Sequence, residues 1–235
     1  MELSVIIPVY NEEKSVGDLI SAIQSDLAEI EHEIIVVDDK STDDTLKNAI
    51  VKKSANVKII SLSRNRGQST AIKAGLDNAT GRIIAIIDGD MQNDPADLPK
   101  LYRLLMSGQA DMIQGYRKDR HDSLSKKIPS MMANALIRML FKTDLNDVGC
   151  SVKVFDRKLR TSLIYFNGFH RYLALIAHIR GATVKEAVVA HHPRMAGKSK
   201  YGLERLIPVC RHLFLLKTDP DKLREELSYD IEAVY

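Results

Sequence analysis

Arg82-Ile83-Ile84-Ala85-Ile86-Ile87-Asp88-Gly89-Asp90-Met91-Gln92 is an apolar, β-type run that stops at an Asp-x-Asp sequence. It predicts a buried strand that carries two carboxylates at its carboxyl end, which is the edge where open α/β sheets bind ligands. Two carboxylates would repel a diphosphate unless a divalent cation lay between them. Asp and Gln oxygens suit Mg²⁺ or Mn²⁺. The stretch therefore predicts a nucleoside diphosphate that is bound through Mg²⁺ or Mn²⁺.

Strand-like and helix-like segments alternate around this run. Short β-branched runs separated by amphipathic helices predict an α/β fold, with a mostly parallel, Rossmann-like sheet and helices on both faces. The predicted strands cover residues 5–9, 33–37, 57–62, 83–87 and 111–114, and the predicted helices cover residues 13–27, 45–53, 69–79 and 96–106.

The pattern changes after about residue 120. A Met- and Leu-rich segment, residues 128–141, has lysines on both sides, and it is followed by a predicted strand at 152–155 and a predicted helix at 171–180. A strand at 183–190 and a helix at 203–217 come next, before a charged tail that starts at residue 219. We divide the chain into a catalytic unit, residues 1–202, and a C-terminal helical tail, residues 203–235.

The bulk properties exclude several classes of protein. The chain has 235 residues, 28% of them charged, and a formal net charge of +3. This small charge, without interleaved aromatic and basic repeats, predicts no nucleic-acid partner. A predicted strand begins within the first five residues, so we expect no secretory leader. The longest apolar stretches are shorter than the ~20 residues that a membrane-spanning helix needs. Cys150 and Cys210 are expected to be reduced, buried thiols.

Polar clusters follow the predicted strands. In a parallel sheet the first four of them meet at one edge. Each cluster alone also has a structural explanation: Asp38 and Asp39 can cap a helix, and Asp88 and Asp90 can form a turn around Gly89. The clusters are Pro8-Val9-Tyr10-Asn11-Glu12, Asp38-Asp39, Asp88-Gly89-Asp90-Met91-Gln92, Gly115-Tyr116-Arg117 and Arg194-Met195-Ala196-Gly197-Lys198-Ser199-Lys200-Tyr201.

The combination and order of these motifs resemble the family 2 glycosyltransferases, and within them the polyprenyl-phosphate glycosyltransferase branch typified by dolichol-phosphate mannose synthase. The resemblance covers roughly residues 3–205. Besides the clusters above, it rests on Ser4-Val5-Ile6-Ile7-Pro8-Val9-Tyr10-Asn11-Glu12-Glu13, Val37-Asp38-Asp39-Lys40-Ser41-Thr42-Asp43-Asp44-Thr45 and Leu62-Ser63-Arg64-Asn65-Arg66-Gly67-Gln68.

The resemblance implies a GT-A fold, in which a Rossmann-like nucleotide-binding half is joined to an acceptor-binding half. It implies that Asp88, Asp90 and Gln92 hold the metal and the diphosphate. It also implies that the donor nucleotide sugar is bound by Pro8, Tyr10, Glu12, Val37, Asp39, Asp88, Gly89 and Asp90.

The implied reaction is inverting transfer of a hexose from GDP-mannose or a UDP-sugar to dolichyl or undecaprenyl phosphate. The basic residues Arg117, Arg194 and Lys200 match positions that engage phosphates, and with Asp90 they form the expected catalytic set. Lys126 and Ser130, together with Arg117, match positions at the acceptor phosphate. An acceptor phosphate is already an anionic nucleophile, so no general base is strictly required.

A lipid acceptor implies contact with a membrane. The segments 128–141 and 203–217, apolar and with basic residues in or beside them, suit helices that lie among lipid headgroups, although both can equally pack on the core. We expect a protein that is peripheral on the cytoplasmic face of a membrane. Whether it acts alone, through an anchoring partner subunit, or as a piece of a longer chain stays open, as do the nucleotide and the sugar.

The chain departs from the family pattern at Lys40 and Asp44, which replace two expected glycines. One rival interpretation is a GT-A enzyme that glycosylates a saccharide hydroxyl, with Asp144 or Asp147 as the general base. A second rival is a catalytically silent scaffold of a membrane glycosylation complex. An NAD-binding Rossmann protein is excluded, because no Gly-x-Gly-x-x-Gly follows the first strand.

Overall fold

The structure is a computed structural model that describes the backbone of residues 1–118, 124–193 and 206–235, and the side chains of residues 1–118, 130–193 and 208–235. Arg194 and Lys200 lie outside the described residues, as does the side chain of Lys126.

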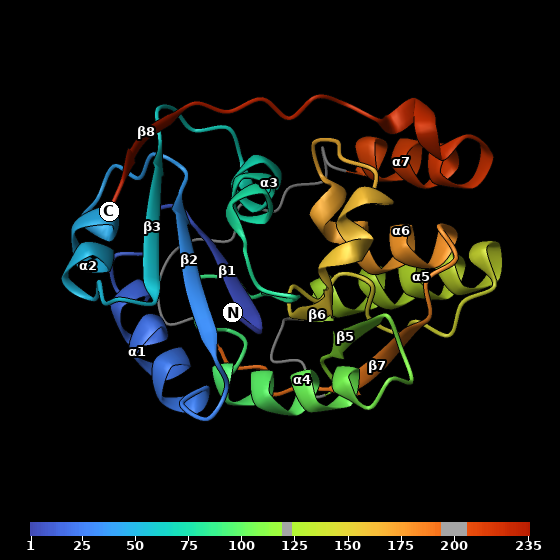
Figure 1. The fold of residues 1–235 in the computed structure, drawn as a ribbon. Coiled ribbons are helices and arrows are strands. Elements are labelled where there is room, and N and C mark those ends of the chain that lie inside the picture. Colours follow the sequence, from blue (N-terminus) through green and yellow to red (C-terminus); the bar gives the residue numbers. More distant parts are fainter. Residues whose placement is uncertain (119–123, 194–205) are drawn as a thin grey trace.

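A single sheet of eight strands runs through the molecule in the order β7-β5-β6-β4-β1-β2-β3-β8 (Figure 1). All strands are parallel to β1 except β6 and β8, so the prediction of a mostly parallel sheet is confirmed. The strands are β1 (Leu3–Val9), β2 (His32–Asp38), β3 (Val57–Leu62), β4 (Ile83–Ile86), β5 (Met112–Tyr116), β6 (Lys153–Asp156), β7 (Val184–Val188) and β8 (Ile231–Val234).

Helices cover both faces of this sheet, as predicted (Figure 1). One face carries α1 (Val16–Asp26), α2 (Thr45–Val51) and α4 (Leu98–Met106), preceded by the 3-10 turn η1 (Pro95–Asp97). The other face carries α3 (Gln68–Asn78), α5 (Leu124–Phe141), α6 (Leu173–Ile179) and α7 (Leu206–Thr218), with the 3-10 turns η2 (Arg157–Thr161), η3 (Phe169–Tyr172) and η5 (Pro220–Leu223).

The apolar strands are buried on both faces because their side chains alternate between two cores. In β1, Val5 and Ile7 pack with α1 and α4, whereas Ile6 packs with α3 on the opposite face. All seven residues of β1 and of β2 are buried. This double burial explains why these strands read as continuous β-branched runs rather than as alternating patterns.

Pro8 lies inside a central strand without breaking the ladder. The ladder from β1 to β4 ends at the pair Ile6–Ile86, and the Ile87 N–H donates to the Ile6 carbonyl. Two residues further on, Pro8 faces the same side beyond the end of β4. Its missing N–H therefore costs no ladder hydrogen bond.

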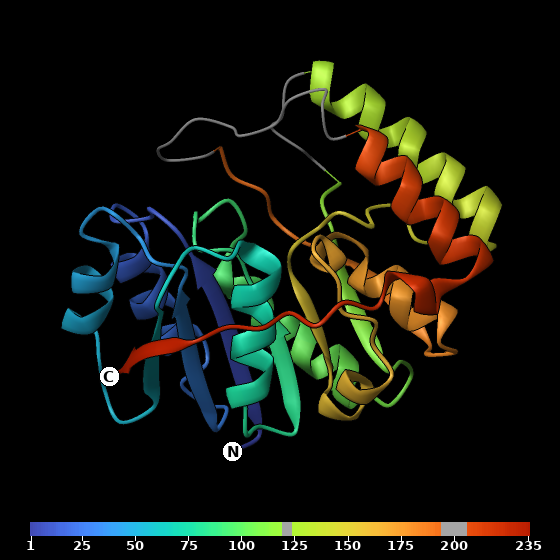
Figure 2. The same cartoon turned by 90° about the horizontal axis from the view of Figure 1, so that it is seen from above.

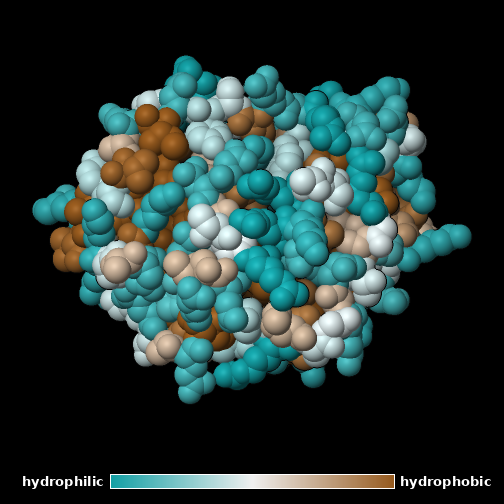
Figure 3. All heavy atoms as spheres, viewed as in Figure 1, coloured by the Kyte–Doolittle hydropathy of each residue, from teal (hydrophilic) through white to brown (hydrophobic). Residues whose placement is uncertain are grey.

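The charged tail forms structure that the sequence did not predict. From α7 it runs across α3 and ends in β8, which pairs antiparallel with β3 (Figures 1 and 2). Tyr229 Oη donates to Asp77 Oδ2 of α3 at 2.9 Å, and Lys40 Nζ lies 2.5 Å from Glu232 Oε2. On the face drawn in Figure 3 hydrophilic residues dominate, and hydrophobic residues gather over the end of the sheet formed by β3 and β8.

Two further expectations need correction. The helix expected at residues 171–180 is split into η3 and α6, because Gly168 in a left-handed conformation starts a 3-10 turn there. Cys150 is buried as expected, but Cys210 on α7 is exposed. Helical periodicity alone did not show which face of α7 would meet the core.

Candidate active site

Six parallel strands deliver their carboxyl ends to one edge of the sheet. β1, β2, β3, β4, β5 and β7 all point the same way, since β6 reverses direction between β4 and β5. The polar clusters that follow β1, β2, β4 and β5 therefore lie at a common edge. This is the edge at which α/β sheets bind ligands.

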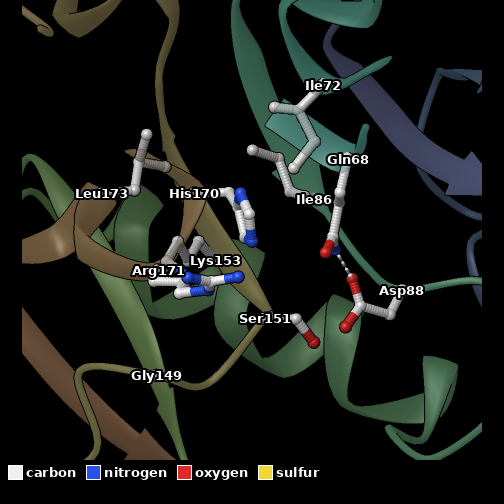
Figure 4. Close-up of a pocket in the computed structure, with 10 residues that line it drawn as sticks. All are labelled: Gln68, Ile72, Ile86, Asp88, Gly149, Ser151, Lys153, His170, Arg171 and Leu173. Carbon is white, nitrogen blue, oxygen red and sulfur yellow. Dashed lines mark hydrogen bonds between the residues drawn. The ribbon is translucent and has the colours of Figure 1, made fainter. Parts of the chain in front are cut away.

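The turn after β4 holds two carboxylates close together. Burial, and then the charge of Asp90, raise the pKa of Asp88 to about 6. Gln68 Nε2 on α3 donates to Asp88 Oδ1 at 2.7 Å, which fixes the direction of this carboxylate (Figure 4). A buried carboxylate beside a second carboxylate forms a site that a cation stabilises.

The backbone of this turn is anchored on both sides. The Gly89 carbonyl accepts a hydrogen bond from Ser15 Oγ at 2.8 Å. A Cβ at Gly89 would lie 2.7 Å from Cγ1 of Val9, so the glycine lets the turn press against β1. Asp90 Oδ1 accepts from the Gln92 N–H at 3.2 Å, and the Gln92 carbonyl accepts from the His192 N–H at 2.7 Å. The hydrogen bonds that place Gln92 are thus made by its backbone.

The residues present fit a divalent cation that is shared with a diphosphate. In the described part of the chain, no group of three or more His, Cys, Asp and Glu side chains is placed to hold a metal by itself. Mg²⁺ in nucleotide sites is commonly bound by one or two carboxylates, with substrate phosphates and water as the other ligands. Asp88 and Asp90 provide such a set.

Asp38 and Asp39 at the end of β2 take different directions. Asp39 accepts hydrogen bonds from the N–H groups of Arg66 and Gly67, both at 2.7 Å, and so fixes the loop before α3. Asp38 accepts from the Ser41 N–H at 3.2 Å, and burial raises its pKa. Both carboxylates thus shape the loops at this edge, which is the structural role that the sequence left open.

The remaining residues expected around the donor lie at the ends of β1 and β2. Pro8 and Val37 are buried within the sheet, and Tyr10 is half-buried just beyond β1. The Glu12 N–H donates to Thr45 Oγ1 at 2.7 Å, and Ser15 Oγ lies 3.4 Å from Glu12 Oε2. Glu12 therefore joins the start of α1 to the start of α2.

Arg117, directly after β5, forms a two-pronged ion pair with Asp147. Nε donates to Oδ2 at 2.7 Å and Nη2 donates to Oδ1 at 2.9 Å. The two side chains are 14% and 4% exposed. Glu186 of β7 accepts from the Asp147 N–H at 2.8 Å, which holds the same loop from the other side. Ser130 lies half-buried on α5.

A pocket beside Asp88 brings together residues that the sequence did not single out. Lys153, His170 and Arg171 lie across the pocket from Asp88 and Gln68 (Figure 4). Lys153 is 2% exposed, and burial lowers its pKa. A lysine inside the apolar run Val152-Lys153-Val154-Phe155 was the available signal, since a strand core rarely takes a charge.

With this geometry in view, the comparisons identify the family. The model of glycosyl transferase family 2 matches residues 4–163. The chain belongs to glycosyl transferase family 2. The turn Asp88-Gly89-Asp90, the Arg117 segment and the Asp147 loop all lie inside the matched region.

Relatives within the family confirm the expected polyprenyl-phosphate branch. The chain is 40% identical over 221 residues to the dodecaprenyl-phosphate galacturonate synthase of Rhizobium johnstonii, covering 91% of this chain and 65% of the relative. It is 32% identical over 228 residues to the undecaprenyl-phosphate 4-deoxy-4-formamido-L-arabinose transferase of Klebsiella pneumoniae, covering 94% and 69%. The chain thus spans 65–69% of the length of these curated relatives.

Solved glycosyltransferases confirm the expected GT-A fold. The crystal structure of glucosyl-3-phosphoglycerate synthase from Mycobacterium tuberculosis with Mn²⁺, UDP and glucosyl-3-phosphoglycerate matches with a TM-score of 0.72. The match covers 99% of this chain and 86% of that chain at 19% sequence identity. At this identity the likeness concerns the fold.

Proposed function

We propose that this family 2 glycosyltransferase transfers a sugar, with inversion, from a nucleoside diphosphate to a polyprenyl phosphate and requires Mg²⁺ or Mn²⁺. The observation that carries the proposal is the pair Asp88–Asp90, held by Gln68 and Ser15 at the sheet edge where ligands bind. The names of the two curated relatives, which act on dodecaprenyl and undecaprenyl phosphate, support the acceptor class. GDP-mannose and UDP-sugars are the donor classes that the sequence resemblance brings forward.

The chain's own residues serve this reaction by positioning charge. Asp88 and Asp90 would hold the metal, which supplies charge stabilisation to the departing nucleoside diphosphate. Arg117, fixed by Asp147, places a guanidinium at the end of β5 on the same edge. A fixed cation there favours the approach of an anionic acceptor to an anionic donor.

A hydroxyl acceptor would need a general base, and the two candidate carboxylates, Asp144 and Asp147, are poorly suited to that role. Asp147 is buried, and its two oxygens accept hydrogen bonds from Arg117. Asp144 is exposed to solvent. An acceptor phosphate needs no such base, so the geometry favours a phosphate acceptor over a saccharide hydroxyl.

The close pair Asp88–Asp90 also disfavours the silent scaffold. Burial, and then the charge of Asp90, raise the pKa of Asp88 to about 6, and a cation bound between the two carboxylates would relieve their repulsion. A scaffold without donor binding gains nothing from this repulsion.

We further propose that α5 and α7 meet the lipid surface, on the cytoplasmic face of a membrane. They lie side by side at one end of the molecule (Figure 2). Leu213 and Leu216 of α7 pack on the core, but Phe214 is 67% exposed. Within the described residues, no helix has the length and apolarity to cross a bilayer. On the described part of α5 the exposed large hydrophobic residues are Met131, Met132, Leu136 and Met139.

We propose that residues 1–202 form the catalytic unit and that residues 203–235 form a tail that carries α7. Apolar side chains along a helix that is half-buried in protein suit insertion among lipid headgroups. An anchoring partner subunit is compatible with the same surface. Binding to liposomes, compared between the parent and a Met131→Ser/Met139→Ser variant, tests the assignment. Equal binding by both proteins would contradict it.

The reaction itself is tested by sugar transfer to undecaprenyl phosphate. Radiolabelled GDP-mannose, UDP-glucose, UDP-N-acetylglucosamine and UDP-galacturonate would be offered with Mn²⁺ or Mg²⁺, and again with EDTA. We expect label in the lipid phase from at least one donor, lost with EDTA. Donor hydrolysis without a lipid product would point to another acceptor, and transfer that survives EDTA would remove the metal from the proposal.

A further inference from the structure

The pocket beside Asp88 has an unbalanced charge. Its lining contains one acidic residue, Asp88, against Lys153, Arg171 and the imidazole of His170 on the opposite wall (Figure 4). Three further side chains, Ile72, Ile86 and Leu173, give this space apolar walls. A small space with apolar walls and a cationic end suits a sugar ring that carries a negative charge.

Lys153 is the deepest of the cations. Its ammonium donates to the Cys150 carbonyl, and burial lowers its pKa. The charge of Asp88 raises that pKa and so partly compensates the ammonium. A metal bound by Asp88 and Asp90 would draw this negative charge to itself. A further anion near Lys153 would then be favoured, since a buried charge without a counter-charge is unfavourable.

Arg171 reaches the same space from η3. Among the described residues, no ion pair joins its guanidinium to an Asp or Glu side chain. Its neighbour His170 is oriented by a 2.8 Å contact between Nδ1 and Ser69 Oγ, and Ser69 Oγ in turn accepts from the Gly168 N–H at 2.8 Å. The η3 turn is therefore braced against α3. A braced guanidinium can bind a carboxylate through two parallel hydrogen bonds.

We propose that the donor is a nucleoside diphosphate uronate, whose sugar carboxylate binds to Arg171 and Lys153. This inference rests on the proposed function and selects the sugar class for it. A metal held by Asp88 and Asp90 would fix the diphosphate at one end of the pocket. The sugar attached to that diphosphate then extends towards the opposite wall, where the two cations lie. A neutral hydroxymethyl group in that place would bring neither cation a counter-charge.

The acceptor phosphate is the other anion that these cations could hold. Measuring donor binding in the absence of acceptor distinguishes the sugar carboxylate from the acceptor phosphate. Titration of UDP-galacturonate and UDP-galactose into the full chain with Mn²⁺, without lipid, compares donors that differ only in carboxylate against hydroxymethyl. We expect the uronate to bind at least 10-fold more tightly. UDP-glucuronate and UDP-glucose repeat the comparison with the other configuration at C4.

Substitution of Arg171 tests whether its guanidinium binds the sugar carboxylate. Arg171→Gln is expected to weaken UDP-galacturonate binding, and to lower kcat/KM for its transfer to undecaprenyl phosphate, by roughly 10- to 100-fold, the loss typical of one charge-assisted pair. Binding of UDP-galactose should change less than about threefold. Arg171→Lys keeps the charge and should recover part of the loss. Arg103→Gln, on the exposed side of α4, is the matched control and should leave both donors unchanged.

Two outcomes would overturn the inference, and a third would contradict the proposed function instead. Comparable or higher kcat/KM with UDP-galactose, UDP-glucose or GDP-mannose would remove the uronate and leave the proposed function standing. An Arg171→Gln variant with unchanged donor binding but a raised KM for undecaprenyl phosphate would assign Arg171 to the acceptor instead. Uronate binding without any transfer to lipid would support this pocket assignment and contradict the proposed function.

Discussion

Arg117 and Asp147 form a buried, two-pronged ion pair that joins the end of β5 to the loop before β6. The two residues are far apart in sequence, yet this pair sets the direction of the Arg117 side chain at the end of β5. Asp147 is therefore a positioning residue for Arg117. Its carboxylate is committed to that role.

The variant Asp147→Asn tests this relationship. It keeps the shape but removes the charge, and leaves a nearly buried guanidinium without its counter-charge. We expect a loss of about 2–3 kcal/mol in the free energy of unfolding and a raised KM for the acceptor. Chemical denaturation and steady-state kinetics measure both. The pH profile of kcat should keep its shape, whereas a base role for Asp147 would remove its acidic limb.

Asp90→Ala removes one of the two carboxylates that fit the metal. Because Asp90 is half-exposed, the fold should persist, while turnover should fall at least ~100-fold as charge stabilisation of the leaving diphosphate is lost. Circular dichroism and the transfer assay check the two statements. Asp144→Asn is the matched control, since Asp144 is exposed on the neighbouring loop. If the Asp90→Ala variant keeps turnover near the parental level and still requires the metal, the assignment of the metal site is wrong.

Glu33 gives the fold a defined dependence on pH. Burial raises its pKa, but hydrogen bonds from Ser4, Thr80 and Gly81 outweigh burial, so the net shift is downward. A carboxyl with a lowered folded-state pKa stabilises the fold above its unfolded pKa of ~4.3 and loses that effect as the pH falls below it.

We therefore expect Glu33→Gln to cost about 1–2 kcal/mol in the free energy of unfolding at pH 7. The difference from the parent should shrink as the pH drops below about 4. Urea denaturation at pH 7, 5 and 3.5 measures it. A difference that stays constant across this range would show that packing, rather than the charge, explains the loss.

Lys40 occupies a backbone conformation that favours glycine, with φ of +61°. Its ion pair with Glu232 is largely exposed and contributes little. Lys40→Ala and Lys40→Gly both remove that pair, so their difference isolates the backbone. We expect the glycine variant to be more stable than the alanine variant by about 1 kcal/mol. Thermal unfolding of both checks it, and equal stability would mean that this turn relaxes.

Much of the fold follows from local patterns. The strand at residues 57–62 is found at its predicted bounds, and the first five strands lie within a few residues of their predicted positions. Their β-branched runs and the caps between them depend on neighbours in sequence. The two positions where the family pattern has glycine differ in backbone conformation. Lys40 takes the left-handed φ that favours glycine, whereas Asp44 has φ of −77° at the start of α2 and does not require a glycine.

What the sequence did not predict depends on contacts between distant residues. The strand β8 has only four residues and lies in a charged tail, and its pairing with β3 makes it a strand. The basic wall of the pocket combines Lys153 of β6 with Arg171 of η3, and no spacing rule relates them. The commitment of Asp147 to Arg117 was hidden for the same reason, so Asp147 read as a candidate base.

The course of the tail has a mechanical consequence. Because α7 continues through residues 219–230 into a strand that is hydrogen-bonded to β3, a force on α7 acts on the sheet edge beside α2. Tyr229 and Glu232 tie the same segment to α3 and to the Lys40 turn. If α7 rests on a bilayer, the tilt of the whole sheet is set by that contact. The mouth of the donor site would then be held at a fixed height and angle above the lipid headgroups.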